Sequence, residues 1–126
     1  METLPTRIIR VLVGLLLVFA GLNKFFHFAP DPPHNDAGGA FLGALVQSGY
    51  VMTIVAIVEI VCGAAFIAGR FVALAAVLLA PVALNIVLFH TMLDSSGAAP
   101  GLFVGAATLY LLFVNLPKYQ DMLMPR

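Results

Sequence analysis

The stretch Val51–Ala68 reads VMTIVAIVEIVCGAAFIA, and its only charged residue is Glu59, near the middle. An apolar run of this length predicts a membrane-spanning helix, which would place Glu59 close to the bilayer midplane. A charge at that depth costs roughly 2.5–3.5 kcal/mol on insertion scales. We therefore expect Glu59 to face protein or water, and we expect the other helices to gather around it and provide partners.

The composition defines the class of protein. Hydrophobic residues make up 62% of the 126 residues and charged residues 10%, against about 45–50% and about 25% in soluble domains. Too few polar residues remain to cover a soluble helical bundle, so the chain reads as one integral membrane domain. A formal charge of zero argues against nucleic-acid binding, which needs a basic face. Cys62 is the single cysteine, which excludes an internal disulfide and a C-x-x-C pair.

Residues 1–126 are expected to form a single all-α domain, a four-helix integral membrane bundle. Apolar runs predict spans at about residues 8–28, 51–68, 71–93 and 102–116. The first apolar run continues past Phe19 and no A-x-A-like cleavage site follows it, so we expect it to be kept as a span and not removed as a signal peptide. The fourth is short for about 30 Å of hydrocarbon.

The segments between the spans have their own signals. Residues 30–39, PDPPHNDAGG, predict a loop. Residues 40–48 follow a helical pattern that is too short to cross, which favours a brief helix in the outer interface. Pro81 lies inside the third span and should kink it, because it leaves the carbonyl of Val77 without its helical donor.

Basic residues predict the orientation in the membrane. Five fall on one side of the predicted spans and only Lys24 lies toward the other; the five are Arg7, Arg10, Arg70, Lys118 and Arg126. Positive charge favours the cytoplasmic side. We therefore expect a multi-pass protein of the cell (inner) membrane with both termini in the cytoplasm.

Polar residues of three spans fall near a common depth. Counted at 1.5 Å per residue, Asn23 and Lys24 lie roughly 20 Å above the cytoplasmic end, Glu59 roughly 16 Å and Asn85 roughly 22 Å. His90 lies higher, at roughly 30 Å, and points away from Asn85. The cluster has two interpretations. It is either a buried ion pair with hydrogen bonds that fix helix register, or a ligand-binding or proton-exchanging site.

Small residues mark the faces that carry this cluster. Gly14 and Gly21 share a stripe with Lys24 on the first span, and Ala56 and Gly63 share one with Glu59 on the second. Small residues let helix backbones approach closely in membranes. Cys62, beside the second stripe, is expected to be a packing residue.

The three histidines fall on the expected outer side, near Asp31, Asp36 and Asp94. No metal-binding spacing such as H-E-x-x-H is present. We therefore expect no metal site, and the residues leave open any other role for these histidines.

An ordered series of motifs resembles the DoxX family of membrane proteins. The series is GLNKF at 21–25, FLGALVQSGY at 41–50, VEIVCGAAFIAGRFVALA at 58–75 and LAPVALNIVLFH at 79–90. The resemblance implies four membrane helices. It also implies an association with quinol oxidation, thiosulfate:quinone oxidoreduction or oxidative-stress responses, in which such proteins act with partner proteins.

Two functions follow as hypotheses. The first is a membrane subunit of a quinone-linked redox or oxidative-stress system, in which Glu59 exchanges protons, Lys24 tunes it, and Asn85 and His90 bind the ligand. Quinone is then the candidate cofactor. The candidate partners are a soluble or membrane redox protein and a second copy of the chain. The alternative is a non-enzymatic membrane scaffold or a carrier for a small hydrophobic compound.

Overall fold

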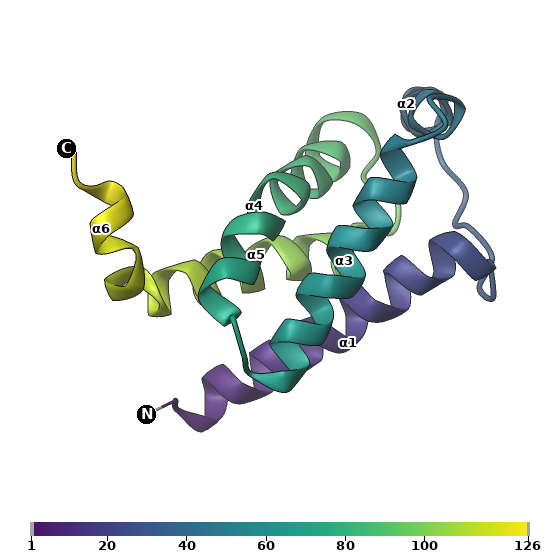
Figure 1. Cartoon of the computed structure of the whole chain (residues 1–126). Coiled ribbons are helices and arrows are strands. Elements are labelled where there is room, and N and C mark those ends of the chain that lie inside the picture. The colour runs from purple at the N-terminus through teal and green to yellow at the C-terminus, as the bar shows by residue number, and fades with distance from the viewer. Residues whose placement is uncertain (1, 126) are drawn as a thin grey trace.

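The computed structural model describes residues 2–125, and its regular structure there is entirely helical. Five longer helices and three short segments follow one another along the chain (Figure 1). They are α1 (Leu4–Phe26), α2 (Asp36–Gln47), α3 (Val51–Ala68), α4 (Val72–Leu88), the π-helical segment η1 (Phe89–Leu93), α5 (Ala98–Val114), the 3-10 segment η2 (Leu116–Tyr119) and α6 (Gln120–Leu123).

Helix α1 begins and ends earlier than the predicted span of 8–28. Its first turn contains Pro5, and the hydroxyl of Thr3 accepts a hydrogen bond from the Thr6 amide, which caps the helix. At the other end His27 adopts a left-handed conformation with φ 52°. That conformation ends the helix before Phe28.

Helix α2 corrects the predicted boundary between loop and short helix. It begins at Asp36, four residues before the expected start, so the loop is shorter than 30–39. The reason is Asn35, whose side-chain oxygen accepts a hydrogen bond from the Gly38 amide at 2.7 Å and caps the helix. Gly38 and Gly39 fall inside the predicted loop of residues 30–39, but the cap and the packing of Gly38 against Asp94 hold them in the helix.

The third span is one continuous helical segment that begins as an α-helix and ends as a π-helix. Helix α4 runs through Pro81 as α-helix, and the change of geometry comes further along, where Phe89–Leu93 form a π-helix. Residues 72–93 together are long and apolar enough to cross a membrane.

The predicted fourth span begins and ends earlier than 102–116. Helix α5 has 17 residues and stops at Val114, where the Asn115 side chain donates a hydrogen bond to the Leu111 carbonyl. The chain then bends by 71° into Leu116–Leu123. Within residues 2–125, three helices are long and apolar enough to cross a membrane, and four if this bent pair forms one span.

The glycine stripes bring α1 and α3 together, as the sequence predicted. A Cβ atom placed on Gly63 would lie 2.8 Å from the backbone oxygen of Gly14, and one on Gly14 would lie 2.8 Å from that of Gly63. A Cβ on Gly21 would lie equally close, 2.8 Å, to the Ala56 carbonyl oxygen. The two backbones are therefore in direct contact along a line that leads to Lys24 and Glu59.

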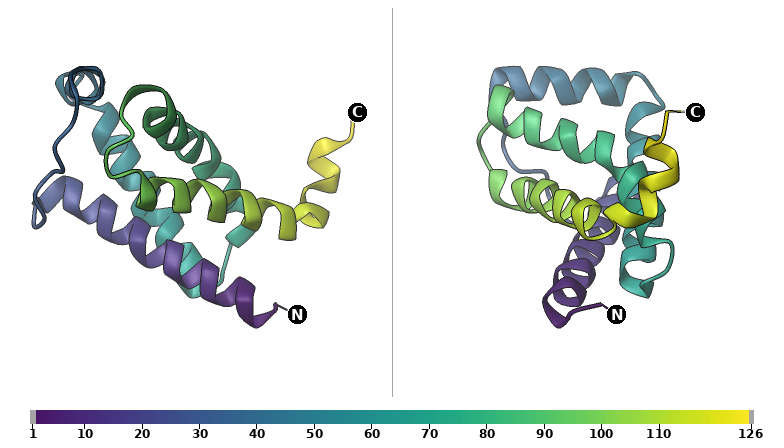
Figure 2. Two further views of the ribbon diagram at one scale, coloured as in Figure 1. Left: turned by 180° about the vertical axis from the view of Figure 1, so that it is seen from behind. Right: turned by 90° about the vertical axis from the view of Figure 1, so that its left-hand side faces the viewer.

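Helices α1 and α3 form one closely packed pair, and α4 and α5 form the other. Contacts of α3 with α4 and of α1 with α5 join the pairs into a four-helix bundle (Figure 2). The bundle core holds Val13, Leu17, Cys62, Phe66, Ala75, Ala76, Leu79, Ala83, Val104, Ala107 and Leu111. Helix α2 lies across the end opposite the N-terminus (Figures 1 and 2).

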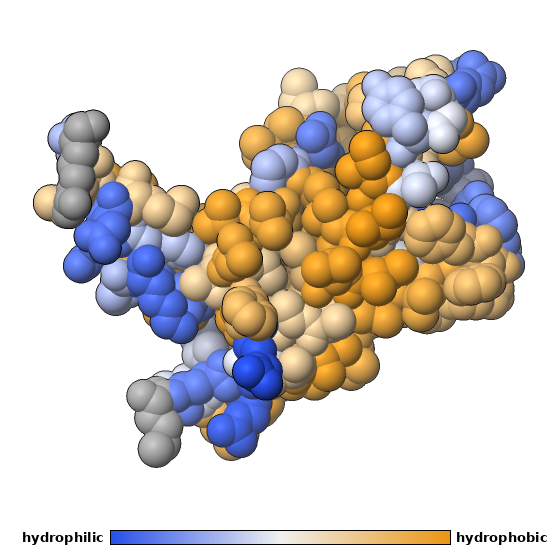
Figure 3. All heavy atoms as spheres, viewed as in Figure 1, coloured by the Kyte–Doolittle hydropathy of each residue, from blue (hydrophilic) through white to orange (hydrophobic). Residues whose placement is uncertain are grey.

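The outer surface of the bundle is also apolar. Leu12, Ile57, Leu78 and Leu109 are each about half exposed or more (51%, 50%, 54% and 56%). Hydrophilic residues gather toward the ends of the molecule, and a broad hydrophobic surface lies between them (Figure 3). Such a surface is stable in lipid and not in water, so the chain is an integral membrane protein.

Candidate intramembrane ion-pair site

Lys24 and Glu59 meet inside the bundle. The Nζ atom of Lys24 lies 2.6 Å from Oε1 of Glu59, across the close contact of α1 with α3. The glutamate side chain is 3% exposed and the lysine side chain 26%. The pair is therefore sealed on the carboxylate side and reachable on the ammonium side.

The carboxylate has few polar neighbours. Lys24 is its only ionic partner among the described residues. The contact is short, and apart from this ion pair Oε1 receives no hydrogen bond within residues 2–125. A buried oxygen without a directed donor is uncommon in native proteins. Lys24, whose side chain is partly exposed, is thus the member of the pair that a small molecule can reach, with the carboxylate directly behind it.

The structure brings together only these two of the five predicted site residues. Asn23 turns to the end of its own helix, where its Oδ1 accepts a hydrogen bond from the Ala29 amide at 2.8 Å. Asn85 is exposed on α4, and its amide donates to the Pro81 carbonyl at 3.4 Å. The ring Nδ1 of His90 lies 3.1 Å from the Asp94 carbonyl oxygen. Their expected ligand contacts stay predictions.

Asp94 forms a second polar cluster, which sequence reasoning left unassigned. Its carboxylate accepts hydrogen bonds from the backbone amides of Ser96 at 2.9 Å and Asn35 at 3.0 Å, and it pairs with His34 Nδ1 at 3.1 Å. Asn35 also donates to the Leu93 carbonyl. The cluster ties the start of α2 to the end of η1. The signal in the sequence was Asp94 itself, followed by Ser-Ser-Gly, which is typical of an Asx turn.

The Asp94 cluster predicts a pH dependence. Hydrogen bonds from Ser96, then from Asn35 and His34, hold the pKa of the Asp94 carboxyl well below its usual range. A lowered pKa in the folded state stabilises the fold above the unfolded pKa of about 4 and loses that effect as the pH falls further. We expect Asp94→Asn to lose protection of α2 amides from hydrogen exchange at pH 6. The difference from the unmodified protein should shrink below pH 4; a constant difference would contradict this assignment.

Arg10 fixes the opposite end of α1 to α3, which sequence reasoning also missed. Its side chain is almost fully buried and donates to the carbonyls of Phe66 and Ile67 in the last turn of α3. A cation there satisfies carbonyls that the helix leaves unpaired. The same guanidinium makes two hydrogen bonds to Glu2, at 2.8 and 3.0 Å, which lower the pKa of that carboxyl.

Replacing Arg10 should weaken the junction of α1 with α3. We expect Arg10→Met to lower the free energy of unfolding by about 2 kcal/mol, because hydrogen bonds from a charged donor are lost. Arg7→Met is the matched control, since the Arg7 side chain is 62% exposed and lies 3.6 Å from Glu2. The control should change stability by about 0.5 kcal/mol or less. Equal effects in the two variants, measured by denaturant unfolding in mixed micelles, would contradict the assignment.

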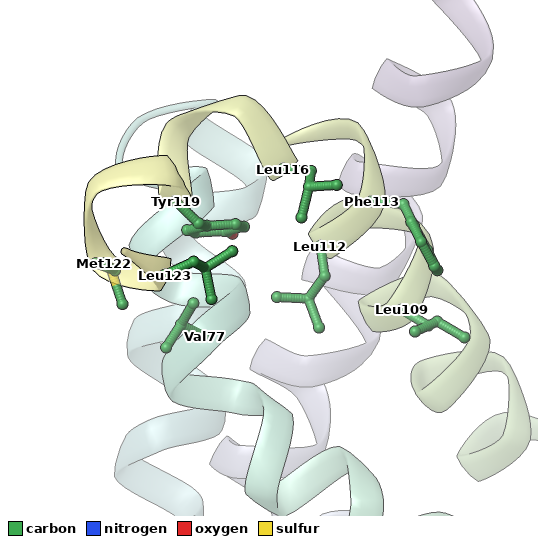
Figure 4. A pocket seen from close by; sticks show the side chains of 8 residues that line it. All are labelled: Val77, Leu109, Leu112, Phe113, Leu116, Tyr119, Met122 and Leu123. Carbon is green, nitrogen blue, oxygen red and sulfur yellow. The ribbon is translucent and has the colours of Figure 1, made fainter. Parts of the chain in front are cut away.

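An apolar pocket of about 290 Å³ lies where the chain bends after α5 (Figure 4). It is lined by Val77, Leu109, Leu112, Phe113, Leu116, Tyr119, Met122 and Leu123. The Tyr119 hydroxyl does not offer a hydrogen bond to the pocket, because it donates to the Ala73 carbonyl at 2.7 Å. The pocket thus offers only apolar contacts and suits a hydrocarbon chain.

The fold and the ion pair define a small polytopic membrane protein with an ionisable site between two closely packed helices. The family model DoxX matches residues 6–92, a range that includes both Lys24 and Glu59. The chain belongs to the DoxX family. Comparison with the curated proteins and with the solved structures finds no match.

Proposed function

We propose that this protein is a membrane subunit of a quinone-linked redox or oxidative-stress system, and that Lys24 and Glu59 form its proton-exchanging site. The observation that carries the proposal is the 2.6 Å contact of Lys24 Nζ with Oε1 of Glu59, a carboxylate that is 3% exposed in the middle of a membrane-spanning helix. Ionisable residues within membrane spans are rare and mark ligand or proton pathways.

The two side chains offer the hydrogen-bonding and proton-exchanging groups that binding of a quinone head group requires. Lys24 is partly accessible and can donate a hydrogen bond to a carbonyl or phenolate oxygen, while Glu59 can accept a proton at Oε1. A bound quinone would supply two-electron, two-proton redox chemistry, and a partner protein would supply or remove the electrons. Within this chain, Lys24 orients the ligand and Glu59 holds or releases the proton, while the surrounding apolar helices exclude water.

The proposal includes an orientation. Arg7, Arg10 and Arg70 lie at the end where α1 begins and α3 ends, and the contact of Tyr119 with Ala73 holds Lys118 toward the same end. Positive charge favours the cytoplasmic face, so both termini would lie in the cytoplasm and α2 on the outer side of the cell membrane.

Binding of a short-chain benzoquinone to the protein in lipid nanodiscs tests the site. We expect Glu59→Gln and Lys24→Met each to weaken binding by about tenfold, because each removes one charged hydrogen-bonding partner. Thr108→Val is the matched control, because Thr108 is a buried polar residue of α5 whose hydroxyl donates to the Val104 carbonyl of the same helix. Proton uptake or release on binding, measured in buffers of different ionisation heat, should disappear in Glu59→Gln. Binding unchanged in both site variants would contradict the proposal.

The apolar pocket favours a second candidate, a carrier for a small hydrophobic compound. Its lining contains no free polar group, so it would select by shape and apolarity alone. Leu112→Trp should fill it and reduce the hydrocarbon compounds that co-purify with the protein. If this variant loses a bound compound while Glu59→Gln keeps it, the carrier function is favoured over the redox site.

A further inference from the structure

One face of α4 is exposed along its whole length with a regular spacing. The residues on it recur at intervals of four, three, four and three, as in a heptad repeat; they are Leu74, Leu78, Pro81, Asn85 and Leu88. The opposite face of α4 is buried against the bundle through Ala75, Ala76, Leu79 and Ala83. Alternation of three and four residues is the pattern with which two helices pack in a left-handed pair.

Asn85 is the unusual member of this face. It lies 13 residues beyond Val72, so about 20 Å along a span of about 33 Å, within the hydrocarbon. Its amide offers two donors and an acceptor oxygen. The single hydrogen bond it makes within residues 2–125 is a long one of 3.4 Å, to the Pro81 carbonyl of its own helix. Unsatisfied polar groups in lipid cost several kcal/mol, so this side chain needs a partner from outside the chain.

A second copy of the chain provides that partner better than lipid or an unrelated helix. Two copies share one topology, so their α4 helices run parallel and place both Asn85 side chains at the same depth. A carboxamide is self-complementary, because each copy donates to the other and accepts from it. The face carries no charged residue, so its contact with itself brings no like charges together. Leucines on both sides of Asn85 supply the packing.

We infer that the protein forms a two-fold symmetric dimer through this face of α4, with the two Asn85 side chains hydrogen-bonded across the interface. The interface is isologous, so each residue of the stripe meets its own counterpart or a neighbour of it. This leaves the α1–α3 side, with Lys24 and Glu59, free of the dimer contact.

Cysteine cross-linking of the full chain in lipid vesicles tests the face. In a Cys62→Ala background, Leu78→Cys and Leu88→Cys should give disulfide-linked dimers on oxidation. Leu15→Cys on α1 and Ile57→Cys on α3 are matched controls, because Leu15 and Ile57 are 54% and 50% exposed and lie on other faces. The controls should stay monomeric. Dimers formed through the controls and not through α4 would overturn the inference.

Energy transfer between labelled copies tests Asn85 itself. We expect Asn85→Leu to weaken dimerisation by about tenfold, since an interhelical hydrogen bond in a membrane contributes about 1–2 kcal/mol in model peptides. Asn85→Gln should retain most of the affinity. Because Asn85 is exposed, both variants should fold, which amide exchange of α4 can verify. Two results would overturn the inference: a protein that stays monomeric at every protein-to-lipid ratio, or a dimer whose affinity does not change in Asn85→Leu. This face of α4 would then contact lipid or another protein.

Discussion

Lys24→Met should destabilise the folded protein by about 3 kcal/mol, because it leaves the carboxylate of Glu59 buried without the ammonium that pairs with it at 2.6 Å. Glu59→Leu should lower the free energy of unfolding by less than Lys24→Met does. The Lys24 side chain is 26% exposed, so its ammonium can turn toward the interface when the carboxylate is gone. The free energy of unfolding in bicelles, measured for each variant, gives the two values.

The double variant separates structure from chemistry. Lys24→Met with Glu59→Leu replaces the pair by apolar groups and should recover most of the lost stability, since such replacements of buried pairs are often neutral or stabilising. We expect the double variant to fold and yet to lose quinone binding. Additive losses, with the double variant as unstable as the sum of the single ones, would show that the two residues do not interact.

Gly63→Leu should lower the free energy of unfolding by about 3 kcal/mol or more, because the contact of α1 with α3 has no room for a side chain. A Cβ on Gly63 would lie 2.8 Å from the Gly14 carbonyl oxygen and 3.0 Å from the Val18 amide nitrogen, and backbone atoms cannot turn aside. The helices must then separate, which also pulls Lys24 away from Glu59. Gly63→Ala should show a smaller loss of about 1–2 kcal/mol.

Gly43→Ala is the matched control for this prediction. Gly43 lies in α2, and a Cβ placed there meets no atom within 4 Å. Alanine favours helix over glycine by up to about 1 kcal/mol. The same substitution should therefore be neutral or stabilising in α2 and destabilising in α3. Equal effects at the two positions would contradict the close helix contact.

The sequence predicted the features that depend on long apolar runs and on local spacing. Membrane helices, the contact of the glycine stripes, the burial of Cys62 and the meeting of Lys24 with Glu59 all follow from such patterns. A charge inside an apolar span has few stable environments, so an opposite charge at a similar depth on a neighbouring span is its expected partner.

The sequence could not predict which of several possible hydrogen-bond partners each polar side chain binds. Asn23 lies at the right depth, but its own helix ends three residues later, at Phe26, and its side chain satisfies the freed Ala29 amide instead. The rotation of α4, which turns Asn85 outward, depends on how α4 packs against α3 and α5. The bend after α5 depends on Asn115 and Pro117, which a hydropathy pattern does not resolve.

The distance between the Lys24 ammonium and the Glu59 carboxylate is the most direct test of the account. The chain contains two lysines and two glutamates, so ¹⁵Nζ-lysine and ¹³Cδ-glutamate labels can be read by solid-state NMR in a bilayer with little overlap. We expect a nitrogen–carbon dipolar contact of less than about 4 Å, the range of a close ion pair. It should survive Lys118→Gln and vanish in Lys24→Gln. A folded protein without that contact would contradict the central claim that the pair meets inside the membrane.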